Sequence, residues 1–251
     1  MIEPWVYPAL TVVAVLTGFI DAIAGGGGLI MMPALLFAGV PPINALATNK
    51  LQSMFGTATA CLNYARKGLV DWRSNWLTIV SIFIAAAAGV IVVQSVDTVA
   101  LALVIPLLLM AVALYVLVSP RMSDSDAHQR VSAKTYAPIG AAIGFYDGFF
   151  GPGTGSFFTT TLVAFRGLGL TRATALTKLF NLTSNIAAVL LFAIGGHMFW
   201  LLGLCMAAGA MLGGWIGSHT AIRFGANIIR PLLVILSLAL TTRLLWSYFS
   251  S

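Results

Sequence analysis

Four ionisable side chains, two lysines and two aspartates, lie inside long apolar stretches of this chain. Lys50 and Lys178 occupy the matching segments ALATNKL and ATALTKL, at an offset of 178 − 50 = 128 residues. Asp21 and Asp147 end the matching segments GFID and GFYD, at an offset of 147 − 21 = 126 residues. An ionised side chain in a bilayer interior costs about 3 kcal/mol or more, so such residues are rare and tend to be functional. Their recurrence predicts a charged site between two repeats; the alternative is that each lysine only neutralises an aspartate.

A glycine-rich turn follows each aspartate, GGGG at 25–28 and GPGTG at 151–155. In a helix broken at such a turn, the backbone N–H groups that begin the second half-helix attract an anion. The other interpretation is close packing of helices through small residues. Neither glycine run continues into the GK[ST] sequence of a nucleotide-binding loop, so transport driven by ATP on this chain alone is not expected.

Polar residues share a helix face with the lysines. Asn181 and Asn185 follow Lys178 at helical spacing, and Ser53 and Thr57 are their equivalents 128 residues earlier. Such residues either line a binding site or hydrogen-bond neighbouring helices. The predicted substrate-binding residues are Lys50, Lys178, Asn49, Gln52, Ser53, Thr177, Asn181, Asn185, Gly27, Gly28, Gly153 and Gly155. Asp21 and Asp147 are predicted either to couple a proton or to form structural ion pairs.

The composition defines the elements that must hold these residues. Of the 251 residues, 59% are hydrophobic and 8% are charged, whereas soluble domains carry about 25% charged residues. Apolar stretches of spanning length recur, so the fold class is an all-α polytopic membrane protein with the lipid bilayer as its partner. The net charge of +6 fits basic cytoplasmic loops better than a nucleic-acid partner. No metal or other cofactor is expected, and both a monomer and a homodimer remain open.

The chain divides into two related halves. We expect a first membrane repeat at 1–118, a polar cytoplasmic linker at 119–135 and a second repeat at 136–251. Basic residues cluster in four connections: Arg66, Lys67 and Arg73; Arg121, Arg130 and Lys134; Arg166 and Arg172; Arg223 and Arg230. Residues 39–42, 94–98 and 195–198 contain no lysine or arginine. Where a connection can be compared with its equivalent in the other half, one of the two is basic and the other contains no basic residue. The positive-inside rule places basic connections in the cytoplasm, so equivalent connections lie on opposite sides of the membrane. This predicts inverted-topology repeats.

The inversion constrains the start of each half. Residues 136–165 must enter and leave on the cytoplasmic side, and each arm of about 22 Å is too short for a hydrocarbon core of about 30 Å. The sequence therefore favours glycine-broken, re-entrant half-helices there over two full spans, and a matching hairpin at 4–39. The alternative of full spans remains open, and residues 4–24 are long enough to cross the membrane alone. Full spans are expected at 43–65, 74–94, 99–118, 172–194, 199–221 and 228–249, which puts both termini outside.

Four segments together resemble one family. They are GFIDAIAGGGGLIMMP at 18–33, ALATNKLQ at 45–52, GFYDGFFGPGTG at 144–155 and TKLFNLTSN at 177–185. The chain resembles the TauE/SafE family of sulfite-exporter-like membrane transporters over nearly its whole length. The resemblance implies movement of small sulfur-containing anions, such as sulfite and sulfonates, across the bacterial cytoplasmic membrane.

The residues and the resemblance together predict a secondary active transporter that exports a small organic or sulfur-containing anion, with the proton as candidate coupling ion. The alternative is a passive anion channel, and a remote alternative is a membrane-embedded enzyme. No HExxH motif or His/Cys metal cluster supports an enzyme. Two lysines at the site also disfavour a metal-cation transporter.

Overall fold

The computed structural model describes residues 2–118, 125–126 and 131–225 of the chain. Within these residues the chain is helical, with short turns between the helices. The helices are α1 (Val6–Ala24), α2 (Gly27–Phe37), α3 (Pro42–Arg66), α4 (Trp76–Gln94), α5 (Thr98–Val118), α6 (Ala137–Phe149), α7 (Thr154–Arg166), α8 (Leu170–Ile194) and α9 (Trp200–Phe224).

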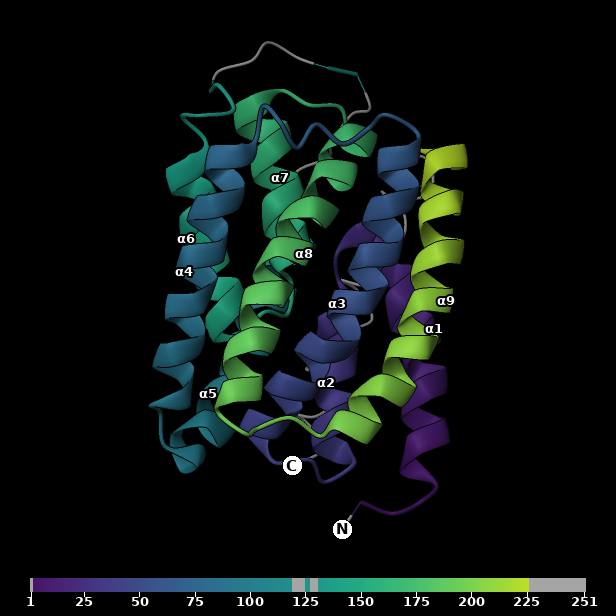
Figure 1. Ribbon diagram of the computed structural model, residues 1–251, viewed down its shortest axis with the longest axis vertical. Coiled ribbons are helices and arrows are strands. Elements are labelled where there is room, and N and C mark those ends of the chain that lie inside the picture. Colours follow the sequence, from purple (N-terminus) through teal and green to yellow (C-terminus); the bar gives the residue numbers. More distant parts are fainter. Residues whose placement is uncertain (1, 119–124, 127–130, 226–251) are drawn as a thin grey trace.

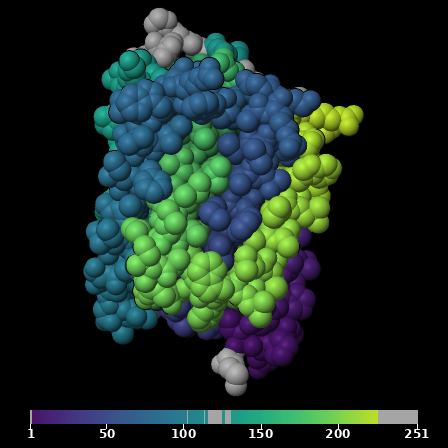
Figure 2. Space-filling view, viewed as in Figure 1, coloured from purple at the N-terminus to yellow at the C-terminus, as the bar shows by residue number. Residues whose placement is uncertain are grey.

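Four long helices stand side by side along the vertical axis of Figure 1. Helices α3 and α8 pack against each other in the middle, α9 packs against α3, and α4 packs against α8 (Figures 1 and 2). The outward faces of α4 and α9 are apolar, with exposed Phe83, Ile84, Leu204 and Leu212 among them. Exposed apolar faces on long helices suit contact with lipid.

Helix α5 packs on α3, and two helical hairpins each pack against the other half of the chain. The first is α1 with α2, of 19 and 11 residues, and the second is α6 with α7, of 13 residues each. In Figure 1, α1 rises from the end that bears the N-terminus and α2 returns towards it, whereas α6 and α7 lie towards the opposite end. Helix α1 packs on α9 and α6 packs on α4, and these are the two most extensive contacts between helices.

The connections segregate to two ends of the bundle by charge. The Arg166 guanidinium donates to Asn75 Oδ1 at 2.6 Å, which joins the end of α7 to the basic α3–α4 connection. Asp126 accepts hydrogen bonds from the Gly169 N–H at 2.7 Å and from Arg172 at 2.5 Å at the same end. At the other end, Asn44 near the start of α3 donates to the His197 carbonyl in the α8–α9 turn at 2.8 Å. Among the described residues, the basic α3–α4 and α7–α8 connections therefore lie at one end of the bundle and the α8–α9 turn lies at the other. Arg121, Arg130 and Arg230 lie outside the described residues.

The helix bounds agree with the predicted spans to within three residues wherever both are described. Four helices, α1, α4, α8 and α9, are long and apolar enough to cross a membrane by length and composition. Helix α3 is as long as α8, at 25 residues, but falls outside this group, since its polar residues lower its hydropathy. The predicted span 228–249 lies outside the described residues.

The contact between α4 and α6 depends on two glycines. A Cβ atom added at Gly89 of α4 would overlap the carbonyl oxygen of Phe145, and one added at Gly148 of α6 would overlap the carbonyl oxygen of Ala86. The two backbones therefore touch directly. Such close approach lets helices gain dispersion energy inside a bilayer, where the hydrophobic effect does not drive them together.

Replacing Gly89 with leucine is expected to destabilise the folded protein by about 1–3 kcal/mol, because the side chain must displace backbone atoms of α6. Ala88→Leu is the matched control, since Ala88 is exposed on the neighbouring position of α4. Thermal unfolding of the detergent-purified variants measures the difference. Equal transition temperatures for the two variants would contradict the described contact.

Candidate functional site

A small polar cavity lies where the two hairpin tips meet α3 and α8. Its volume is about 30 Å³, which is room for about one water molecule. Fourteen residues line it: Asp21, Gly25, Gly28, Asn49, Lys50, Ser53, Thr57, Asp147, Gly151, Gly153, Thr154, Gly155, Asn181 and Asn185. The lining thus combines both intramembrane aspartates, one of the two lysines and residues of both glycine breaks.

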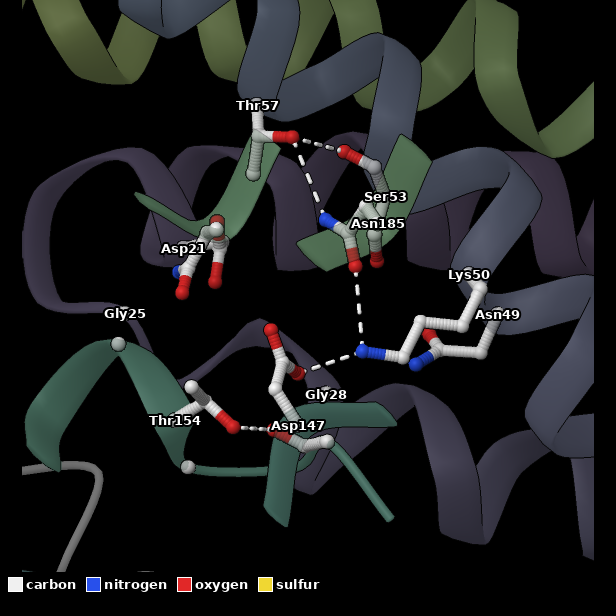
Figure 3. A pocket seen from close by; sticks show the side chains of 14 residues that line it. Asp21, Gly25, Gly28, Asn49, Lys50, Ser53, Thr57, Asp147, Thr154 and Asn185 are labelled. Carbon is white, nitrogen blue, oxygen red and sulfur yellow. Dashed lines mark hydrogen bonds and ion pairs between the residues drawn. The ribbon is translucent and has the colours of Figure 1, made fainter. Parts of the chain in front are cut away.

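Lys50 reaches into this cavity from α3 (Figure 3). Its Nζ lies 2.5 Å from Asp147 Oδ1 and 3.2 Å from Asn185 Oδ1, and only 4% of its side chain is exposed. The other carboxylate oxygen of Asp147 accepts a hydrogen bond from the Ser184 hydroxyl. Asn185 in turn donates to Thr57 Oγ1 at 3.4 Å. A network of polar side chains therefore surrounds the ammonium group and satisfies its charge.

Lys178 has a different environment. Its side chain is fully buried and does not line the cavity. Its Nζ donates to the backbone carbonyl of Asp21 and lies 3.0 Å from Asp21 Oδ2. That carbonyl also accepts the Gly25 N–H at 2.8 Å, at the C-terminal end of α1. A cation at a helix C-terminus interacts favourably with the helix dipole, so Lys178 holds the end of α1 in place.

The ion pairs cross between the halves of the chain. Lys50 of the first half pairs with Asp147 of the second, and Lys178 of the second pairs with Asp21 of the first. Both lysines are therefore neutralised, as one of the two sequence interpretations requires. The formal charges of the four groups sum to zero, which lowers the cost of placing them in the interior.

The two hairpin tips touch through their backbones. Gly25 has φ +72° and ends α1, and a Cβ atom added to it would lie 2.5 Å from the Cα of Gly155. Helix α2 begins at Gly27 and α7 at Thr154, so both helices start beside the cavity. The partial positive charge of two helix N-termini consequently faces the same small volume.

The remaining predicted residues divide between two cavities and the packed interior. Asn49, Ser53, Asn181 and Asn185 line the main cavity, whereas Gly27 and Gln52 line an adjoining cavity of about 10 Å³. Thr177 lies elsewhere, with its hydroxyl 3.1 Å from that of Thr159. The structure thus brings most of the predicted set together, but leaves Thr177 and Lys178 outside both linings.

Asn181 stands out among the lining residues. Its side chain is 6% exposed, and its Oδ1 atom has no hydrogen-bond partner. Burying an amide group without its hydrogen bonds costs about 1–3 kcal/mol. Because an amide oxygen accepts hydrogen bonds, the missing partner is a donor, such as water or a protonated group in the cavity.

Sequence reasoning did not assign a role to four residues at the site. Gly25, Gly151 and Thr154 line the cavity, and Ser184 bonds Asp147. The first three belong to the glycine-rich segments at 25–28 and 151–155, so the sequence pattern indicates their location at the site. Ser184 carried no signal, because its equivalent position 128 residues earlier is Gly56.

Comparison with known proteins gives a consistent set of relatives. A family model described as "Sulfite exporter TauE/SafE" matches residues 10–244. The chain is 46% identical to "Probable membrane transporter protein ORF9" of Sinorhizobium sp over 240 residues, covering 94% of this chain and 91% of that protein. It is 42% identical to a "Probable membrane transporter protein" of Haemophilus influenzae over 235 residues, covering 93% and 92% respectively. It is 41% identical to "Probable membrane transporter protein YfcA" of Escherichia coli K12 over 247 residues, covering 98% and 92%. No solved structure matches the chain at a significant level.

The Lys178→Met substitution is expected to cost about 3–5 kcal/mol of stability, because it leaves the Asp21 carboxylate without its counter-charge. The double variant Lys178→Met/Asp21→Asn removes both charges and is expected to regain most of that loss. A double-mutant cycle measured by thermal unfolding gives the coupling energy. Additive effects of the two substitutions would refute a direct interaction between these side chains.

Proposed function

Because this chain belongs to the TauE/SafE family, we propose that it is a secondary active transporter for a small organic or sulfur-containing anion of the sulfite or sulfonate class. The relatives that it matches over nearly their whole length bear the name of membrane transporters, and none of those compared above is named as an enzyme. The anion is carried across the bacterial cytoplasmic membrane, and export is the direction that the description of the family implies.

One observation carries the proposal: the cavity joins a buried ammonium group to two helix N-termini. Lys50 contributes a full positive charge, and the starts of α2 and α7 contribute backbone N–H groups and the positive ends of their dipoles. The Ser53 hydroxyl borders the same volume and accepts from Gln52, so its hydrogen remains for a ligand. The Thr57 and Thr154 hydroxyls also border it but already donate to backbone carbonyls. Donors that converge from several sides suit the oxygen atoms of a sulfite or sulfonate group.

The packing of the chain supports two inverted halves with the site between them. Each hairpin packs on a long helix of the other half, α1 on α9 and α6 on α4. The two ion pairs cross in the same reciprocal way. With the basic end of the bundle in the cytoplasm, α1 and α2 enter from outside as a hairpin, and α6 and α7 enter from inside. The 13 residues of α6 and of α7 span about 20 Å each, which suits half-helices that end near the midplane.

The size of the cavity supports a carrier rather than a channel. At about 30 Å³ the cavity is small beside a sulfite or sulfonate group, so we infer that the lining helices move apart when the anion binds. A site that closes between binding events is the requirement of alternating access, in which one half rocks against the other. A passive channel, by contrast, needs a continuous path when it conducts.

The experiment that tests this function is a transport screen in proteoliposomes with sulfite, sulfonates and small carboxylates. The variant Lys50→Met/Asp147→Asn carries no uncompensated charge at the Lys50 pair, so it is expected to insert and fold yet to lose anion transport by at least about tenfold. Lys67→Met is the matched control, because Lys67 is an exposed lysine of the α3–α4 connection. Full anion transport by the double variant would refute the assignment of the Lys50–Asp147 pair to the anion site.

Asn181→Ala is expected to weaken anion binding without loss of stability. The Asn181 side chain makes no hydrogen bond among the described residues, so its truncation loses none. A hydrogen bond that its Nδ2 group donates to an anion is worth about 1.5 kcal/mol, or about tenfold in affinity. Asn185→Ala provides the contrast, since Asn185 bonds Lys50 and Thr57 and its loss should lower stability as well. Anion affinities and unfolding temperatures of both variants provide the test; unchanged affinity in Asn181→Ala would contradict a lining role.

A further inference from the structure

The two lysine–aspartate pairs do not have equivalent surroundings, although they occupy equivalent sequence positions. In the Lys50–Asp147 pair both residues line the cavity, so a ligand there would contact both charges. In the Lys178–Asp21 pair only the aspartate lines the cavity, and the ammonium group is fully buried against the α1 backbone. Release of Lys178 from the Asp21 carboxylate would therefore give the cavity no free cation, because the backbone carbonyl still holds it.

An anion that enters the cavity must compete with Asp147. The Lys50 ammonium already lies 2.5 Å from that carboxylate, so an anion bound to Lys50 would lie within a few ångströms of a second negative charge. Two like charges at such a distance in a water-poor site repel strongly, and protonation of one of them is the usual resolution. A proton on Asp147 removes the repulsion and leaves the whole charge of Lys50 for the anion.

The other ionisable groups around Asp147 do not offer this exchange. Helix α4, which packs on α6, has no ionisable residue, and α7 has only Arg166 at its far end. Helix α8 carries Lys178, which Asp21 holds, and Arg172 near its start, which pairs with Asp126. On α6 itself, the Tyr146 hydroxyl donates to the Pro152 carbonyl at 2.7 Å. Lys50 is thus the cation that bonds Asp147 among the described residues.

We propose that the anion and one proton occupy this site together, with Lys50 as counter-charge of the anion and Asp147 as acceptor of the proton. The inference rests on the proposed function and adds its coupling. The site then goes from neutral and empty to neutral and loaded, since one negative and one positive charge enter together. Lys178 and Asp21 form a positioning pair that fixes the end of α1.

Joint binding determines the relative direction in which anion and proton move and the net charge that each transport cycle carries. Anion and proton move in the same direction, one for one, so a cycle carries no net charge across the membrane. Export would remove an acid from the cell. It would be driven by the concentration of the anion inside, opposed by an acidic exterior and independent of the membrane potential. By linkage, each ligand increases the affinity of the site for the other by the same factor.

The wild-type protein in proteoliposomes provides the first test, with radiolabelled methanesulfonate as probe, because its charge is fixed across the working pH range. We expect an acidic exterior to drive methanesulfonate accumulation, with an equal flux of protons reported by a pH-sensitive dye inside the vesicles. At low methanesulfonate concentration, the uptake rate should rise up to about tenfold for each unit by which the outside pH falls, the slope for one proton per anion. A potassium diffusion potential set with valinomycin should not change the rate.

The outcomes separate the inference from the function on which it rests. Uptake that follows the membrane potential, ignores the pH gradient and moves no protons would overturn joint binding and leave an anion transporter. Absence of any methanesulfonate transport in the wild type would overturn the sulfonate function and this inference with it.

The assignment to Asp147 is tested by Asp147→Asn, which is expected to abolish accumulation driven by the pH gradient and to flatten the pH profile of binding. Asp126→Asn is the matched control: it removes an exposed carboxylate that pairs with Arg172, and it should keep the wild-type pH profile. A wild-type pH profile in Asp147→Asn would overturn the assignment. If Asp147→Asn does not fold, the wild-type proton flux still decides whether proton and anion bind together.

Discussion

Each intramembrane lysine of this protein bonds to the aspartate of the other half, and the rest of the structure depends on this reciprocal pairing. An unpaired charge in a membrane interior costs several kilocalories per mole, and in this structure each half buries its lysine and aspartate against partners from the other half. The pairing links a side chain of α3 to α6 and one of α8 to α1, and both linked aspartates lie at the hairpin tips. The same four charges that make the fold costly thus determine where a polar cavity forms.

The glycine contacts make that geometry possible. Helices α4 and α6 approach until their backbones touch at Gly89 and Gly148, and the hairpin tips meet at Gly25 and Gly155. Larger side chains would hold the helices apart and move the carboxylates out of reach of the ammonium groups. Close packing, one of the two sequence interpretations of the glycines, is therefore observed, and it is compatible with the role proposed for them at the site.

Much of this arrangement was predictable from the sequence, because cost and periodicity are both visible there. Charges inside apolar segments, glycine breaks after each aspartate and polar residues at helical spacing identified most of the cavity lining, including Lys50, Asp147 and Asn181. The partner of each lysine was not predictable, since pairing within a half and across the halves fit the same pattern. The role of Ser184 was not predictable either. Ser184 is one position from the predicted residue Asn185 and so faces a different side of the helix. Only the packing of α6 on α8 brings it to Asp147.

The difference between Lys50 and Lys178 also depends on three-dimensional packing. Both occupy the same motif, yet only Lys50 lines the cavity. Lys178 bonds a backbone carbonyl at the end of α1, whereas Lys50 bonds the side chain of Asp147. The two halves are alike in sequence pattern, but their contributions to the site differ.

The hydrogen bond between Asn185 and Thr57 shows how far this difference extends. These residues are 128 positions apart, the offset that relates the two lysines, so each contacts its own counterpart from the other half. In a dimer of identical chains both positions would carry the same residue, and the two faces of the site would have equal affinity. One chain that contains both halves is free to place an amide opposite a hydroxyl. In a carrier of the kind proposed above, this difference would let the site hold the same solute more tightly on one side of the membrane than on the other.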